Sequence, residues 1–342
     1  MNNLRKIAEI CNTSPCFRGK ILFNEPMAAH TTFKIGGPAD IFIEPADERS
    51  FIFVLSEAAA FAIPLFILGG GSNLVVSDKG IEGCVLSTAS LNHISFDGSV
   101  LHCGAGCTFD EVLDFCRRHS LGGLESFAGL PGSVGGAVYM NARCYEKSIS
   151  DVLVSADYIC AEKRKTTADT DGTAVDAAAD CTAAFPAGST AGKIEKLHYA
   201  MRKNDWDYKK SPFSASAFSG SLPIVLSASF TVHNEEEAVI AQKCRDFIQD
   251  REKKGHFRYP SAGSVFKNNR AFGKPSGQII DEAGLRGLRC ADAQIAPWHG
   301  NFIVNLGNAS ADNIKELVKQ IEKDVKSKTG LDLECEIIFC GR

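Results

Sequence analysis

Gly129-Leu-Pro-Gly-Ser-Val-Gly-Gly-Ala-Val-Tyr-Met-Asn141 is the stretch from which the fold can be inferred. Four of its first eight residues are glycines, and with Pro131 this composition predicts neither a stable helix nor a regular strand. Glycine lets the backbone approach a ligand closely, and consecutive free N–H groups form a concave nest that suits phosphate oxygens. The stretch therefore predicts a loop that holds the phosphates of a cofactor.

A second glycine loop, Leu68-Gly-Gly-Gly-Ser-Asn73, precedes the first in the chain. Two such loops indicate a diphosphate that is held from two sides. A dinucleotide-binding Rossmann unit requires a strand, a G-x-G-x-x-G loop and then a helix. Here the loop lies between two expected strands, at 65–68 and 74–76, which argues against the Rossmann fold.

The composition is that of a globular protein with more than one domain. The chain has 342 residues, of which 44% are hydrophobic and 23% charged. A formal charge of −4, with no lysine cluster between aromatic residues, argues against a nucleic-acid partner. Thirteen cysteines without a C-x-x-C pair favour reduced thiols. Since no long apolar run occurs, we expect neither a signal peptide nor a membrane span, and the cytoplasm is the expected compartment.

Apolar periodicity and capping signals predict the elements around the loops. Helices are expected at 48–61 after the N-cap Asp47, at 108–119 after a capping box of Thr108 and Glu111, at 235–254, and from Ser310 to Gly330. Strands are expected at 41–44, 65–68, 74–76, 151–160, 222–232 and 331–340.

Two segments have a particular composition. In the expected last strand, Glu334 and Glu336 alternate with apolar residues and should point away from the apolar face. Residues 163–192 are rich in Ala, Thr, Asp and Gly and contain few large apolar side chains. They predict a mobile surface insertion, because they bury too little apolar area to offset the entropy of ordering.

Six stretches, in the order in which the family has them, resemble the bacterial UDP-N-acetylenolpyruvoylglucosamine reductases, known as MurB. One glycine loop alone is a weak signal, whereas six motifs in register are a strong one. The stretches are Thr32-Phe with Gly36-Gly37, Leu68-Gly-Gly-Gly-Ser-Asn-Leu-Val-Val-Ser-Asp78, Gly129 to Ala142, Pro260-Ser-Ala-Gly-Ser-Val-Phe-Lys-Asn268, Gly277-Gln-Ile-Ile-Asp-Glu-Ala-Gly-Leu-Arg-Gly287 and His299-Gly-Asn-Phe-Ile-Val-Asn305.

The resemblance implies an α+β flavoprotein with an FAD-binding fold of the vanillyl-alcohol-oxidase (PCMH) type. Two FAD-binding subdomains are expected at 20–90 and 91–230, the second with the insertion, and a C-terminal α+β substrate domain at 231–342. The spacing resembles the shorter, second type of the family.

The resemblance also implies the reaction. NADPH and FAD would reduce the enolpyruvyl ether of UDP-N-acetylglucosamine to UDP-N-acetylmuramate for peptidoglycan synthesis. The expected partners are these small molecules only, and the protein is expected to be a monomer without a metal. Two alternatives stay open, namely another FAD-dependent oxidase or dehydrogenase of the same fold and a catalytically silent flavin- or nucleotide-binding relative.

Three residues correspond to the family's catalytic groups. Ser264, in Gly-Ser-x-Phe-Lys-Asn, would donate a proton to the enol carbon, although a lone serine in a turn more often binds its own backbone. Glu336 corresponds to the glutamate, with Glu334 as the competing candidate. Where the family has arginine in Tyr-Arg-x-Ser-x-Phe, this chain has Lys209, a point charge without the bidentate fork of arginine. Either Lys209 suffices, or another arginine such as Arg202 reaches the site, or activity is reduced.

The remaining predicted site residues fall into two groups. Those expected to bind FAD are Gly69, Gly70, Gly71, Ser72, Asn73, Gly129, Gly132, Ser133, Gly135, Gly136 and Asn141. Those expected to bind the substrate are Tyr208, Lys267, Asn268, His299 and Asn301, with Asn305 nearby. The chain departs from the family after Asn141, where Ala142-Arg-Cys-Tyr-Glu146 replaces Ala-Gly-Ala-Tyr-Gly. Arg143 therefore either adds positive charge near a diphosphate or faces solvent.

Overall fold

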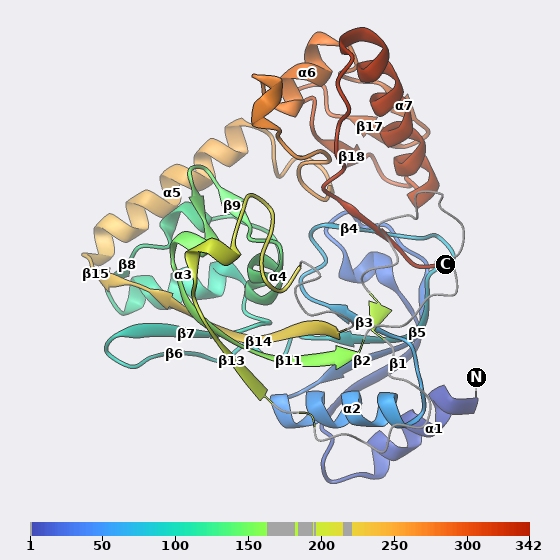
Figure 1. Ribbon diagram of the computed structural model, residues 1–342, viewed down its shortest axis with the longest axis vertical. Helices are drawn as coiled ribbons and strands as arrows, with labels where there is room; N and C mark the ends of the chain where they lie inside the picture. The colour runs from blue at the N-terminus through green and yellow to red at the C-terminus, as the bar shows by residue number, and fades with distance from the viewer. Residues whose placement is uncertain (1, 163–181, 184–193, 195, 215–220) are drawn as a thin grey trace.

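A computed structural model describes residues 2–162, 182–183, 194, 196–214 and 221–342 (Figure 1). The predicted insertion at 163–192 lies outside these residues, apart from Thr182–Ala183. Among the described residues, no helix combines the length and the apolar character that crossing a bilayer requires. The twelve cysteines in the described part of the chain are all free thiols.

The first sheet is built from the N-terminal part of the chain. Its strand order is β1-β2-β5-β3-β12, with parallel pairing of β2 with β5 and of β3 with β5. The strands are β1 (Gly19–Pro26), β2 (Pro38–Pro45), β3 (Leu65–Leu68), β5 (Ile81–Ser87) and β12 (Thr182–Ala183). Helices α1 (Asn2–Thr13) and α2 (Glu48–Ala60) lie together beneath this sheet in Figure 1 and share one apolar core with it.

The second sheet is antiparallel throughout, with the order β13-β11-β14-β7-β6. Its strands are β6 (Ile94–Phe96), β7 (Val100–Gly104), β11 (Leu153–Glu162), β13 (Lys196–Ala200) and β14 (Ser221–Thr231). Helices α3 (Phe109–Arg118), α4 (Val134–Tyr139) and α5 (Glu237–Lys253) pack beside it. Two short pairs complete this part, β8 (Leu121–Gly122) with β15 (His233–Asn234) and β9 (Arg143–Cys144) with β10 (Lys147–Ser148).

The C-terminal part has its own core, between a small sheet and two helices. These elements are α6 (Ser276–Glu282), β16 (Arg289–Cys290), β17 (Ala293–Ile295), β18 (Ile303–Asn305) and α7 (Ala311–Thr329). The end of the chain then lies beside the strand that follows the glycine loop 68–73, because β19 (Ile338–Cys340) pairs in parallel with β4 (Leu74–Val76) (Figure 1). Single 3₁₀ turns occur at Met27–His30, Glu125–Phe127, Ile149–Asp151, Lys203–Asp205 and Arg270–Phe272. The domain boundaries at 90 and 230 stay a prediction.

The three predicted N-cap residues, Asp47, Thr108 and Ser310, are confirmed by the hydrogen bonds that they make. The side chain of Asp47 accepts a hydrogen bond from the backbone N–H of Ser50, and Thr108 with Glu111 forms a reciprocal capping box. Ser310 caps α7 through Asn313, and Gly330 ends that helix in a left-handed conformation. These caps are local, so the residues that make them can be identified from the sequence.

Two predictions about secondary structure are wrong. Part of the glycine-rich stretch is the short helix α4, which Ser133 caps and which carbonyls of Ala105 and Cys107 anchor to the second sheet. Tertiary contacts therefore overcome the low helix propensity of glycine. The expected strand 331–340 is reduced to β19, because its first part runs beside residues 264–267 and forms only the isolated bridge between Phe266 and Cys335.

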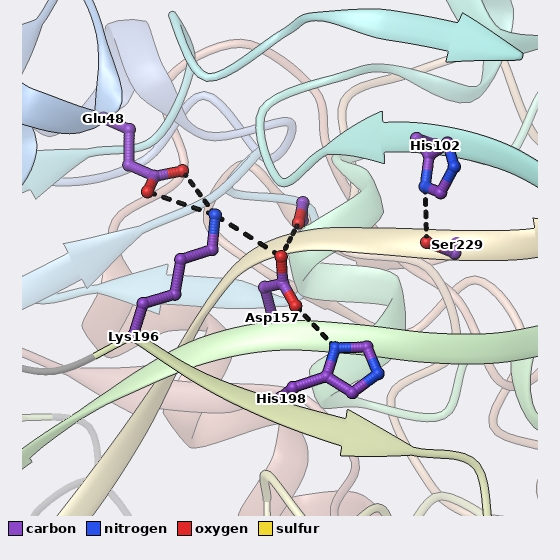
Figure 2. Close-up of polar contacts among 7 residues, drawn as sticks. Glu48, His102, Asp157, Lys196, His198 and Ser229 are labelled. Atoms are coloured by element: carbon purple, nitrogen blue, oxygen red, sulfur yellow. Dashed lines mark hydrogen bonds and ion pairs between the residues drawn. The ribbon is translucent and has the colours of Figure 1, made fainter. Parts of the chain in front are cut away.

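A polar network joins helix α2 to the second sheet (Figure 2). The Nζ atom of Lys196 on β13 lies 3.1 Å from Glu48 on α2 and 3.4 Å from Asp157 on β11. His198 bonds to the same Asp157 at 2.8 Å, while His102 on β7 bonds to Ser229 on β14. Although burial alone would raise it, the pKa of Asp157 is lowered, because His198 and Lys196 stabilise its charged form.

Candidate functional site: two joined cavities

The two glycine loops line one apolar cavity, which we call the glycine slot. Its volume is about 160 Å³, and Pro223, Ile224 and Val225 of β14 also line it. The predicted FAD residues that line it are Gly69, Gly70, Gly71, Ser72, Asn73, Ser133, Gly135 and Gly136. A Cβ added at Gly136 would have only one neighbour within 4 Å, the Ser133 hydroxyl at 3.6 Å. Such a group would otherwise stand in open space, so Gly136 keeps room free for a ligand.

Other glycines let the two loops touch each other. A Cβ at Gly70 would come within 2.4 Å of the Gly132 backbone, and Gly132 itself lines neither cavity. The Ser133 hydroxyl accepts hydrogen bonds from the N–H groups of Gly70, at 3.2 Å, and Gly136, at 3.4 Å. Part of the glycine requirement is therefore structural, because it allows two backbones to pack without side chains between them.

A larger cavity opens from the end of the slot, and we call it the polar cavity. Its volume is about 910 Å³, at the upper end of the range for small-molecule sites. The two cavities share five lining residues, which are Ser72, Asn73, Ser133, Gly136 and Met140. A ligand in the slot can therefore meet a ligand in the polar cavity at this junction.

The three predicted catalytic residues all line the polar cavity. The Nζ atom of Lys209 lies 2.5 Å from a carboxylate oxygen of Glu336, and both side chains are largely buried, at 15% and 8% exposure. The hydroxyl of Ser264 makes no hydrogen bond to any described residue and lines the same cavity. The site thus brings an ion pair and a free hydroxyl to one cavity wall.

Lys209 reaches the cavity from a tight turn. Asp207 and Lys210 exchange both backbone hydrogen bonds around it, and Lys209 has a φ of 55°. The Asn141 side chain donates to the Asp207 carbonyl at 2.8 Å and accepts from the N–H of Ser150 at 3.1 Å. Asn141 was predicted to bind FAD, but it lines neither cavity and instead holds this turn.

A central extended segment positions Ser264. Val265 accepts from the N–H of Glu336 on one side and donates to the carbonyl of Asn301 on the other. The side-chain amide of Asn301 bonds to both backbone groups of Phe266, at 2.8 Å each. Asn301 was predicted to bind substrate, but its amide is used to fix the segment that carries Ser264.

The structure separates the two competing glutamates. Glu334 is exposed and pairs with Lys267, whereas Glu336 is buried against Lys209. The expectation that both point alike, away from the apolar face, is wrong, because residues 331–337 do not form a regular strand. Lys267, predicted to contact the phosphates or the sugar of the substrate, does not line the polar cavity.

The other predicted substrate residues are placed differently. Asn268 and His299 line the polar cavity, while Tyr208 lies just outside it and accepts a hydrogen bond from the N–H of Asn268 at 3.3 Å. Burial lowers the pKa of His299, and it lowers that of its neighbour His256 to about 4, so both rings are neutral near pH 7.

Arg202, the alternative to Lys209, and Asn305, expected near the substrate residues, do not line the polar cavity. Arg202 is exposed and pairs with Asp205 at 3.1 Å. Asn305 is buried, and its side-chain amide bonds to the Phe33 carbonyl and to the N–H groups of Gly307 and Ala309. Lys209 is therefore the cation that meets Glu336.

The sequence did not point to several cations of the polar cavity. Arg251 and Lys254, at the end of α5, and Arg258 line it together with Arg143 and Lys209, whereas Glu336 is the one carboxylate among its described lining residues. The signal available in the sequence was the charged segment after α5, but such a run is more often a solvated face. Among the described residues, no group of three or more side chains could hold a metal ion.

Comparison with known proteins identifies the family. Residues 255–340 match the UDP-N-acetylenolpyruvoylglucosamine reductase C-terminal domain, and residues 39–164 match an FAD binding domain. The chain is 44% identical to the UDP-N-acetylenolpyruvoylglucosamine reductase of Treponema denticola, with 100% of this chain and 99% of the relative covered. This chain belongs to the UDP-N-acetylenolpyruvoylglucosamine reductase family.

Further reductases of the family agree. The Treponema pallidum reductase is 41% identical, and the match covers 93% of each chain. The crystal structure of the reductase from Thermus caldophilus has a TM-score of 0.69 at 27% identity, with 95% of this chain and 99% of that chain covered. The predicted α+β, FAD-binding fold of the vanillyl-alcohol-oxidase type is confirmed.

The residues of the glycine slot fit FAD. The open space at Gly136 and the apolar wall of β14 suit a flat ring system, and the loop N–H groups suit a diphosphate. The slot joins the polar cavity at residues that include Asn73 and Met140, so a flavin held in the slot would meet the cavity that Ser264, Lys209 and Glu336 line.

Proposed function

We propose that this FAD-dependent oxidoreductase uses NADPH to reduce the enolpyruvyl ether of UDP-N-acetylglucosamine to UDP-N-acetylmuramate, a step of peptidoglycan precursor synthesis. The observation that carries the proposal is the junction of the glycine slot with a cavity that contains Lys209, Glu336 and Ser264. Family membership at 44% identity over the whole chain supports the choice of substrate. The reaction would take place in the cytoplasm, with a monomeric enzyme.

FAD, when bound, supplies the hydride chemistry, since it accepts hydride from NADPH and passes it to the terminal carbon of the enol double bond. Hydride addition at that carbon leaves negative charge on the neighbouring carbon and on its carboxylate. Three groups of the chain would then act on that charge.

Lys209 would stabilise the negative charge. Its ammonium group lies on the cavity wall with little access to water, where a fixed cation is worth more than in solution. Lysine offers a point charge instead of the planar fork of arginine, so we expect charge stabilisation without bidentate geometry.

Ser264 would donate a proton to the neighbouring carbon, which carries the negative charge after hydride has been added to the terminal carbon. Its hydroxyl is free of other described partners, and the two residues that follow it, Val265 and Phe266, are fixed by Asn301 and Glu336. A serine is a weak acid, so its proton must be replaced by a neighbouring group as it leaves.

Glu336 is the group that would support this transfer: after taking up a proton from water in the cavity, it would return that proton to the Ser264 oxygen and become a carboxylate again. It is the one carboxylate among the described residues of the cavity wall, and its N–H binds Val265, the residue after the serine. Its charge is balanced by Lys209, which keeps a buried carboxylate in the folded protein.

The decisive experiment is an anaerobic visible spectrum of the purified, FAD-loaded protein. NADPH should bleach the flavin absorption, and the enolpyruvyl UDP-sugar should restore it without oxygen. Bleaching without recovery would refute the proposed substrate and favour another flavin enzyme of this fold. A protein that NADPH does not bleach would instead be a catalytically silent relative or a flavin enzyme that uses another electron donor.

A further inference from the structure

Arg251 is a buried cation that has no carboxylate partner in the described part of the chain. Its side chain is on α5, the residue is 8% exposed, and it lines the polar cavity. The Nη2 atom donates to the sulfur of Cys144 at 3.1 Å, and the guanidinium lies 5.5 Å from the centre of the Tyr145 ring. The Nε atom has no hydrogen-bond partner among the described residues. A buried charge with an unsatisfied donor indicates that an anion is bound there in the working protein.

The first glycine of the central motif makes room for this arginine. Gly129 has a φ of 68°, and a Cβ there would approach the Arg251 side chain to 3.1 Å and the Phe257 ring to 2.9 Å. Gly129 lines the polar cavity and not the glycine slot. The guanidinium is therefore held against the cofactor loop in a fixed position, which lowers the entropy lost when it binds a ligand.

Arg143 adds a second uncompensated charge. It lies on β9 next to Cys144 and lines the same cavity, and its side chain makes no ion pair or hydrogen bond with any described residue. The family usually has a glycine at this position, so the second arginine is a departure from that pattern.

Nearby carboxylates are already occupied. Asp250 accepts from Lys254 at 2.6 Å and from the Tyr145 hydroxyl at 2.9 Å, and Glu336 pairs with Lys209. The positive charge of Arg251 and Arg143 is therefore available to a ligand. Guanidinium groups bind phosphate oxygens in a bidentate manner, which suits phosphates better than a single carboxylate.

Exposed aromatic rings border the same part of the cavity. Tyr145, Phe257 and Tyr259 line it and are 37%, 52% and 44% exposed, respectively. Exposed ring faces beside arginines are a surface on which a nucleobase can stack. Phosphates and a base together describe a nucleotide.

We propose that Arg251 and Arg143 form the subsite for the phosphate groups of the nucleotide ligands, in place of Lys267. The proposal rests on the proposed function, which supplies two such ligands, the diphosphate of the UDP-sugar and the phosphates of NADPH. It places both arginines among the ligand-binding residues of the polar cavity, at a distance from the groups that act on the enol.

Calorimetric titration of the FAD-loaded protein tests the proposal with three probes, UDP, 2′,5′-ADP and 5′-ADP. Arg251→Met should weaken the binding of at least one probe by about tenfold or more, because it removes a buried charge partner. Arg143→Gly, at a more exposed position, should weaken it by about two- to fivefold. Arg251→Lys should lie between wild type and Arg251→Met.

Arg245→Met is the matched control, since Arg245 lies on the same helix, is exposed, and bonds only to Gln242 among the described residues. Its affinities should equal those of wild type. Flavin content and thermal unfolding of each variant show whether the fold is kept. If Arg251→Met unfolds, Arg143→Gly and Arg251→Lys carry the test.

The pattern of losses identifies the source of the phosphate. A loss for UDP alone assigns the subsite to the UDP-sugar, a loss for 2′,5′-ADP alone assigns it to the 2′-phosphate of NADPH, and a loss for both assigns it to both ligands. Unchanged affinities in all folded arginine variants, with wild type binding UDP, would overturn this proposal and leave the proposed function intact. If the wild-type protein binds none of the probes, the proposed function is refuted as well.

Discussion

The ammonium nitrogen of Lys209 lies 2.5 Å from a carboxylate oxygen of Glu336, although 127 positions separate the two residues in the 342-residue chain. Both side chains are largely buried, and they meet on the wall of the polar cavity where it joins the glycine slot. This pair sets the charge at the proposed reaction centre. The close contact of the two opposite charges offsets part of the cost of burying each of them in a place that excludes most water.

Lys209→Met should impair both stability and activity. The variant leaves the Glu336 carboxylate buried without its partner, which we expect to lower the unfolding free energy by about 3 kcal/mol. Loss of the fixed cation should lower kcat on the order of a hundredfold. Urea unfolding and steady-state kinetics measure the two effects. Lys209→Arg should retain most of both, and a Lys209→Met variant with wild-type kcat would show that the cation has no catalytic role.

Ser264→Ala should slow only one half-reaction. Removal of the proton donor should slow reduction of the enol by about 10²- to 10⁴-fold. Flavin reduction by NADPH should stay within about twofold of wild type, because it requires no proton from this residue. Stopped-flow absorbance records each half-reaction separately. Equal rates of enol reduction in the variant and in wild type would refute the role of Ser264.

Asn141→Gly should loosen the turn that carries Lys209. Glycine tolerates the positive φ of this position but cannot bond to Asp207 or Ser150, so we expect a loss of about 1–3 kcal/mol and a lower kcat. Asn24→Gly is the control, because Asn24 also has a positive φ but is exposed and has no side-chain bond among the described residues. The prediction fails if both variants unfold at the same temperature as wild type.

Gly136→Ala should separate FAD binding from folding. The new methyl group meets only the Ser133 hydroxyl and lies in a helix, so the apoprotein should be as stable as wild type or gain up to about 1 kcal/mol. FAD content should fall, because the methyl group occupies the slot. Gly70→Ala should instead destabilise the apoprotein, since its Cβ would lie 2.4 Å from the Gly132 backbone. Absorbance per protein and thermal unfolding distinguish the two variants. Full FAD content in Gly136→Ala would refute the assignment of the glycine slot as the flavin site.

Asp47 should make stability depend on pH in acid. Hydrogen bonds from the backbone and the hydroxyl of Ser50 lower the pKa of Asp47 to about 2 in the folded protein. Since the folded pKa lies below the unfolded one, the stabilisation is present above about pH 4 and is lost as the pH falls towards 2. The carboxylate is partly exposed and screened, so Asp47→Ala should cost about 1 kcal/mol at pH 7 and little at pH 2. Asp47→Asn should keep the cap without this pH dependence, as urea unfolding at several pH values will show.

Local signals were sufficient for much of the secondary structure. Asp47, Thr108 and Ser310 cap the helices that they were predicted to cap, because a cap involves only residues within one turn. The helix α4 was missed since its stability comes from carbonyls of Ala105 and Cys107, which lie outside the glycine motif. Propensity carries no information about such contacts.

Residue types at fixed spacings were enough to identify the family, the flavin-binding fold type, the glycine loops and the three candidate catalytic residues. Which side chains meet became visible only in the folded chain. Folding turned the amides of Asn141 and Asn301 towards the backbone, and it brought the buried Arg251 to the cavity. The physical reason is that burial and charge pairing depend on residues far apart in the chain, whereas spacing and propensity describe only neighbours.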